Sequence, residues 1–102
     1  MRDTEGRLHR GCNVENAALP QSQCAEATAI GAMIAAGGQT IAAIAIAGPD
    51  GRPCAPCGGC PQRLREFAGP DTPVYLCDGS GLLERHPLGA LHPASFGPGS
   101  LG

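Results

Sequence analysis

The sequence predicts an α/β sandwich, a fold in which helices pack on a β-sheet. Three observations support this class: an almost uncharged helical stretch, a short apolar strand directly after it, and a second helix followed by two more strands. The chain has 102 residues, which is enough for one domain with a single hydrophobic core. We therefore expect residues 1–102 to form one domain.

The first predicted element is a strand at residues 7–14. Its apolar side chains, Leu8, Cys12 and Val14, fall on one side of an alternating pattern, and the turn-forming stretch DTEG precedes it. Cys12 is then expected to be a small buried side chain, and the same is expected of Cys77 on a later strand.

A helix is predicted at residues 23–36. Ser22 is a favourable N-cap, and the pair Gly37-Gly38 is a helix stop. The stretch between them is rich in Ala, Ile and Met and nearly free of charge, so we expect this helix to be buried on most sides.

The rest of the chain alternates strands and helices. Short apolar runs predict strands, and leucine and phenylalanine at helical spacing predict the second helix. The expected elements are a strand at 40–48, a helix beginning close to Cys57, strands at 72–78 and 82–88, and a short helix within 88–96.

Composition excludes several classes of protein. The formal net charge is −2, no run of like charges occurs, and the only aromatic residues are Phe67, Tyr75 and Phe96, so a nucleic-acid polymer is not an expected partner. The longest apolar run, residues 41–48, is far too short to span a bilayer. The polar N-terminus lacks an export signal, which predicts a cytoplasmic protein whose cysteines bind metal or stay reduced.

Cysteines at two predicted helix starts indicate a metal site. Cys57 and Cys60 flank a two-residue gap, so both thiolates can point at one ion. Cys24 and Glu26 occupy the first turn of the other helix. If the two helix starts face each other, three sulfur ligands leave a fourth position open, which is the arrangement of catalytic zinc rather than structural zinc.

Four motifs in this order resemble the small homotetrameric zinc-dependent cytidine deaminases: GCNVENA at 11–17, CAE at 24–26, PCGGC at 56–60 and FGP at 96–98. The resemblance implies a three-layer α/β/α sandwich with a mixed sheet. It also implies hydrolytic deamination of cytidine or 2'-deoxycytidine to uridine or 2'-deoxyuridine and ammonia, a reaction of pyrimidine salvage. The expected partners are a small nucleoside and three further copies of the chain that share active sites.

The resemblance also implies a role for individual residues. Zinc would be held by Cys24, Cys57 and Cys60, and Glu26 would shuttle protons between water, the ring nitrogen and the departing ammonia. The substrate-binding residues would be Asn13 and Glu15 on the ribose hydroxyls, Ala25 through its backbone on the base, and Ala17 and Phe96 at a neighbouring subunit's site.

The chain departs from the family pattern in four places. The family usually has arginine at the positions of Ala27 and Pro61, and an aromatic residue is common at the position of Leu19. Three thiolates on a divalent ion form a net negative centre, which would raise the pKa of the bound water unless another group compensates for the arginine missing at position 27. The family also begins with a helix and a strand that carries an F-x-V-G-A-like segment. We therefore expect Met1 to be an internal start of a longer protein.

Other functions fit parts of the sequence. A deaminase of a cytosine nucleoside antibiotic shares the core motifs, and a non-catalytic zinc-binding relic of a deaminase needs only the cysteines. The spacing of Cys54, Cys57 and Cys60 is similar to part of a ferredoxin motif, which expects a further cysteine where the chain has Leu64. Cys54 is interpreted as a spare thiol. None of His9, His86 and His92 has the spacing of a ligand.

Overall fold

The computed structural model describes residues 1–48 and 59–91, with side chains from Gln62 onward in the second range. Its elements are β1 (Arg2–Asp3), the 3-10 helix η1 (Leu19–Gln21), α1 (Ala25–Ala35), β2 (Ile41–Ala47), α2 (Gly59–Phe67), β3 (Pro73–Asp78), β4 (Gly81–Pro87) and α3 (Leu88–Leu91). The strands form one sheet in the order β1-β2-β3-β4. The pair β2-β3 is parallel and the other two pairs are antiparallel, so the sheet is mixed.

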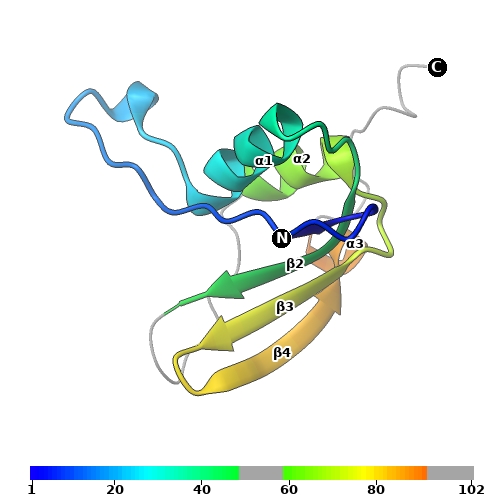
Figure 1. The fold of residues 1–102 in the computed structure, drawn as a ribbon. Helices are drawn as coiled ribbons and strands as arrows, with labels where there is room; N and C mark the ends of the chain where they lie inside the picture. The colour runs from blue at the N-terminus through cyan, green and yellow to red at the C-terminus, as the bar shows by residue number, and fades with distance from the viewer. Residues whose placement is uncertain (49–58, 92–102) are drawn as a thin grey trace.

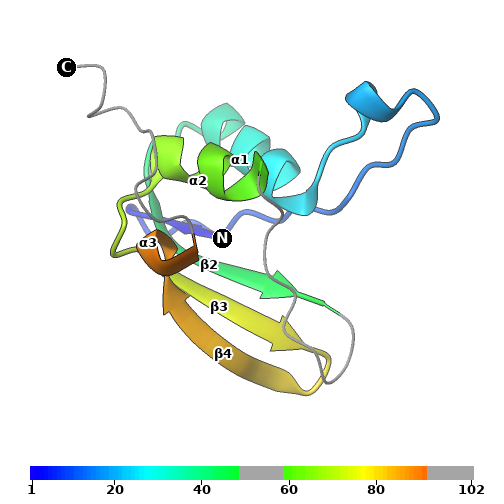
Figure 2. The ribbon, with the colours of Figure 1, turned by 180° about the vertical axis from the view of Figure 1, so that it is seen from behind.

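Helices α1 and α2 lie side by side over one face of the sheet (Figures 1 and 2). This mixed sheet with packed helices confirms the predicted fold class. None of the helices in the described ranges is long and apolar enough to cross a membrane.

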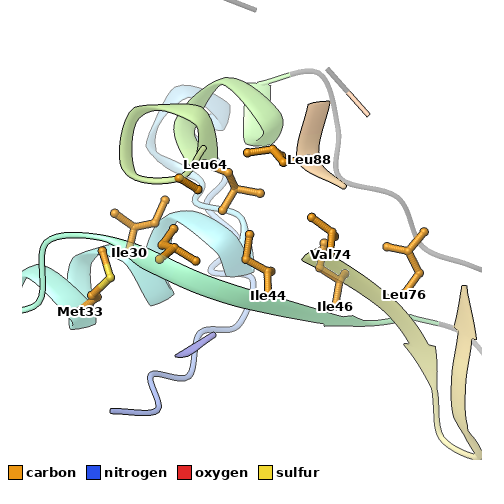
Figure 3. Packing of buried hydrophobic residues seen from close by; sticks show 10 residues of the cluster. Ile30, Met33, Ile44, Ile46, Leu64, Val74, Leu76 and Leu88 are labelled. Atoms are coloured by element: carbon orange, nitrogen blue, oxygen red, sulfur yellow. The ribbon is translucent and has the colours of Figure 1, made fainter. Parts of the chain in front are cut away.

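The hydrophobic core lies between these two helices and the sheet (Figure 3). Alternate residues of β3 point into it, as the period of a strand requires, and β2 contributes its isoleucines. Leu64 of α2 and Leu88 of α3 are both fully buried, so the second half of the chain closes the core. The buried members of the cluster are Ile30, Met33, Ile41, Ile44, Ile46, Leu64, Ala68, Val74, Leu76 and Leu88.

Helix α1 forms almost where it is predicted, and its end follows the expected glycines. Gly37 has φ of +91°, and the backbone N–H of Gly38 donates to Met33 O at 2.9 Å, a Schellman-type stop. Two details of the prediction are wrong. The N-cap is Cys24 rather than Ser22, and only one face of the helix is buried, through Ala29, Ile30 and Met33.

The predicted strand at residues 7–14 is not formed. Only Leu8 and Val14 make isolated bridges, to Arg2 and Gln23, and the rest of this stretch has no ladder. Residues 1–9 instead make a small hairpin, in which the Met1 amino group donates to His9 O at 2.7 Å and His9 N donates to Met1 O at 2.8 Å. Because the stretch has no longer strand to pair with, its side chains stay outside: Leu8 is 79% exposed, and Cys12 is exposed rather than buried.

A buried polar cluster fixes this hairpin. Asp3 Oδ2 lies 2.9 Å from His9 Nε2 and 3.0 Å from Arg7 Nε, and Asp3 Oδ1 accepts the backbone N–H groups of Glu5 and Arg7. The His9 hydrogen bond, followed by these other donors, holds the pKa of the Asp3 carboxyl far below its usual range although burial acts against it. Arg7 Nη1 also donates to Ala36 O at 2.7 Å, so the hairpin is fastened to the end of α1.

Residues 14–23 project from the body of the domain, with η1 near the tip (Figure 1). The projection has internal order: Val14 and Gln23 exchange both backbone hydrogen bonds at 2.8 Å, and the Ser22 hydroxyl accepts the Asn16 N–H at 3.0 Å. The Asn16 contact explains why Ser22 does not cap α1. Ala17 and Leu19 are exposed on this projection.

Candidate active site

The first turn of α1 carries three of the predicted site residues in consecutive positions. Cys24 is the N-cap, with an extended backbone (φ −78°, ψ 161°), and Ala25 and Glu26 begin the helix. All three are half-buried. The helix therefore presents a thiol, a carboxyl group and the positive end of its dipole on one small patch.

Residues 11–13 are joined to this turn by hydrogen bonds. The Ala25 N–H donates to Asn13 Oδ1 at 2.8 Å, so Asn13 satisfies a helix-start donor that the Cys24 side chain leaves open. The Cys12 N–H donates to Thr28 Oγ1 at 3.0 Å, and the Thr28 hydroxyl faces both Cys12 O and Ala25 O at 2.9 Å. These contacts set Asn13 beside the turn that carries Glu26.

Gly11 permits this close approach. A Cβ at position 11 would lie 2.1 Å from Ala25 O and 2.5 Å from both Ala29 N and Thr28 Oγ1. No side chain fits at these distances, so the segment can lie against α1 only with glycine at this position.

A cavity of about 630 Å³ opens between the start of α1, residues 9–13 and the second half of β2. Asn13, Glu26, His9 and Arg10 supply its polar wall, and residues 44–47 of β2 supply an apolar wall. This size and this mixture of one apolar wall with a few polar groups suit a small organic molecule. Burial lowers the pKa of the Met1 amino group, which lies at the same cavity.

The start of α2 lies beside Cys24. Arg63 Nη1 of α2 approaches Cys24 Sγ at 3.5 Å, and position 60 precedes Arg63 by one helical turn. Two helix starts, each with a cysteine in or next to its first turn, are therefore neighbours. Thiolates at such positions are ligands that zinc prefers, so the Cys24 thiol at the start of α1 suits a zinc ion.

The structure brings together some of the predicted site residues and leaves others apart. Asn13, Ala25 and Glu26 line one cavity, whereas Glu15 and Ala17 are exposed on the projection. Other predictions lie outside the described residues: Cys54, Cys57, His92, Phe96 and the side chain of Cys60. Within the described part, no three His, Cys, Asp or Glu side chains converge on a metal position, and Cys24 is the one predicted ligand whose side chain falls there.

Three residues of this region were not predicted from the sequence to belong to the site. His9 is buried against Asp3 and lines the cavity, Thr28 joins α1 to residue 12, and Arg63 contacts Cys24. Only Arg63 carried a usable signal, because it follows Cys60 by three residues on a predicted helix and so shares a face with it.

Comparison with known proteins identifies the class. Residues 1–77 match the family model of the cytidine and deoxycytidylate deaminase zinc-binding region. The chain therefore contains a deaminase domain and belongs to the hydrolase class of enzymes.

Relatives and solved structures narrow this class. The chain is 35% identical over 92 residues to a cytidine deaminase of Sporosarcina psychrophila, a match that covers 90% of this chain and 68% of the relative. It resembles a cytidine deaminase structure from Burkholderia pseudomallei with a TM-score of 0.85 and 38% identity, over 93% of this chain and 76% of that one. For the Mycobacterium tuberculosis cytidine deaminase structure the TM-score is 0.70 and the identity 33%, over 93% and 73% of the two chains. The chain belongs to the cytidine deaminase family, which confirms the predicted resemblance to cytidine deaminases.

Proposed function

We propose that this chain catalyses the hydrolytic deamination of cytidine or 2'-deoxycytidine in pyrimidine salvage, with zinc bound by Cys24, Cys57 and Cys60. The observation that carries the proposal is the position of Glu26. It follows Cys24 by two residues in the first turn of α1 and lies on the wall of the cavity that Asn13 also lines. A proton-transferring carboxyl group, a candidate metal ligand and a substrate-sized space thus occur together.

The proposed mechanism assigns the proton transfers to Glu26. When bound, zinc supplies a water molecule whose pKa is lowered toward neutrality. The Glu26 carboxylate takes a proton from the attacking water and delivers it to the ring nitrogen N3, which makes the adjacent C4 carbon electrophilic. Glu26 then takes the second proton from the new hydroxyl group on C4 and passes it to the departing amino group, so that water and cytidine give uridine and ammonia.

Substrate positioning is assigned to the residues joined to α1. Because the Asn13 side-chain oxygen accepts the Ala25 N–H, its amide nitrogen is left to donate to a ribose hydroxyl. The neighbouring Glu15 would accept from the ribose, and Ala25 would contact the base with its backbone. Ala17 and Phe96 would complete the site of a neighbouring subunit in a cytoplasmic homotetramer.

One experiment tests this function directly. Zinc per chain is measured in the purified protein, and the ultraviolet loss of cytidine is followed for the wild type and for Glu26→Gln. The variant is expected to keep zinc and to lose at least about 10²-fold in kcat, because general acid–base catalysis by one group contributes about 10²- to 10⁴-fold. Glu84→Gln is the matched control, since Glu84 lies on β4 and pairs with His86.

The outcomes separate the competing functions. Turnover that survives Glu26→Gln unchanged would refute the mechanism. Bound zinc without turnover of any cytosine nucleoside would support the non-catalytic relic, and turnover restricted to a cytosine nucleoside antibiotic would support the related deaminase.

A further inference from the structure

The proposed zinc site carries an excess of negative charge, and this inference rests on that proposed site. Three thiolates and one divalent cation sum to a net charge of −1, and Glu26 adds a carboxyl group nearby. The sequence of α1, AEATAIGAMIA, contains no cation that could offset it, since position 27 is alanine. The positive ends of α1 and α2 provide only partial charges, each about half a unit.

The second helix brings a full positive charge to this point. Arg63 Nη1 lies 3.5 Å from Cys24 Sγ, within hydrogen-bonding distance for a sulfur acceptor. A guanidinium group stays protonated under all ordinary conditions and donates through several N–H groups, so its hydrogen bond to a thiolate is charge-assisted.

The space between the helices has room for the Arg63 side chain. A hollow of about 490 Å³ lies between α1 and α2, lined by Ala27 and Gly31 on one side and by Arg63 and Glu66 on the other. The small side chains of α1 leave room for the long side chain from α2. Two other described arginines bind elsewhere, since Arg65 donates to Ala68 O and Arg7 donates to Asp3 and Ala36, whereas Arg10 lines the cavity that Glu26 also lines.

We propose that Arg63 is a positioning residue of the metal site: it orients the Cys24 thiolate and offsets the negative charge of the three-thiolate centre. It supplies from α2 a cation that α1 lacks because Ala27 occupies its first turn. The group acts through Cys24 and does not touch the nucleoside.

The test compares the wild type with Arg63→Met and Arg63→Lys, with Arg65→Met as the matched control on the same helix. Zinc affinity is measured by competition with a chromogenic chelator, and the thiolate-to-cobalt charge-transfer band is recorded after cobalt substitution. Loss of an outer partner of a metal ligand typically weakens metal affinity about 10- to 100-fold, and we expect a loss of that size in Arg63→Met. The band is expected to move to longer wavelength, because a sulfur that loses a hydrogen bond is a better electron donor. Arg63→Lys is expected to retain part of the affinity.

A second variant uses the hollow itself. Ala27→Arg, introduced into Arg63→Met, places a guanidinium on the opposite wall of the same space and is expected to restore a substantial part of the affinity. Arg63 is exposed, so its replacement leaves the core intact, and circular dichroism checks the fold.

Unchanged zinc affinity and an unchanged cobalt band in folded Arg63→Met would overturn the inference while leaving the proposed function standing. If Cys24→Ser bound zinc as tightly as the wild type, both this inference and the proposed function would be overturned. An equal loss of zinc affinity in Arg65→Met and Arg63→Met would also overturn the inference, because removal of any positive charge from α2 would then have the same effect.

Discussion

Replacing Gly11 by alanine is the most specific test of how the site is assembled. The new methyl group would lie 2.1 Å from Ala25 O and 2.5 Å from Ala29 N. These two atoms are the acceptor and donor of an i→i+4 hydrogen bond in the first turn of α1. The methyl group therefore points directly at the turn that carries Glu26.

The size of the effect follows from the distances. To reach even 3.0 Å from Ala25 O, the methyl group must move by 0.9 Å, and residues 11–13 must move with it. That movement strains or breaks the hydrogen bonds of Cys12 with Thr28 and of Asn13 with Ala25. Each of these hydrogen bonds contributes about 0.5–1.5 kcal/mol to the free energy of unfolding. Overpacking alone costs about 1–3 kcal/mol, so we expect the free energy of unfolding to fall by about 2 kcal/mol and Tm to fall by about 10 °C.

Function is expected to suffer more than stability. A displacement of about 1 Å in a substrate-positioning group costs on the order of 10²-fold in rate, so kcat/KM for cytidine should fall by about that factor in Gly11→Ala. Thermal unfolding and steady-state kinetics measure the two effects. Gly31→Ala is the matched control, because a Cβ there meets nothing within 4 Å, and alanine in a helix is expected to add about 0.5–1 kcal/mol. If Gly11→Ala behaved like Gly31→Ala in both assays, the close approach of residues 11–13 to α1 would be disproved.

Three further predictions concern the packing and charge of the domain. Leu64→Ala empties a fully buried position and should lower the free energy of unfolding by about 2–5 kcal/mol in urea titrations, whereas Leu82→Ala, at a site 58% exposed, should change it by less than about 0.5 kcal/mol. Because the pKa of Asp3 is depressed, its stabilising contribution is fully present above its unfolded pKa of about 4. The contribution is lost progressively as the pH falls from that value toward the lower pKa of the folded state. Asp3→Asn should therefore lower the urea midpoint at pH 6 and differ less from the wild type at pH 3; an equal difference at both pH values would contradict this. Thr28→Val keeps the shape of the side chain but removes its hydrogen bonds to Cys12, so KM for cytidine should rise several-fold. An unchanged KM would show that Thr28 does not position residues 11–13.

The regular elements were predictable from the sequence because their signals are local. The apolar run at 41–47 forms β2, and the glycine pair after α1 ends that helix as expected. The strand at 7–14 failed because alternation predicts a strand only when a neighbouring strand supplies hydrogen bonds, and Leu8 and Val14 find only single bridges.

The proximity of candidate site residues was predictable where they are close together in the sequence. Cys24 and Glu26 occupy one helix turn, so their proximity follows from local structure. The contacts of Asn13 with Ala25 and of Arg63 with Cys24 join segments 12 and 39 residues apart, and no local pattern specifies them. His9 shows the same limit, because a buried carboxylate partner decides whether a histidine lies inside.

Residues 3–13 hold α1 at both of its ends: Arg7 binds Ala36 O behind the helix, and Asn13 binds Ala25 N–H in front of it. At about 1.5 Å per residue, the helix between them is a short rod of about 16 Å. The half-buried ion pair of Asp3 with Arg7 and the carboxyl group of Glu26 thus lie near opposite ends of one helix. Loosening of the hairpin would therefore change the angle and depth of the whole helix, including the turn that carries Glu26, and the two regions should open to solvent as one cooperative unit.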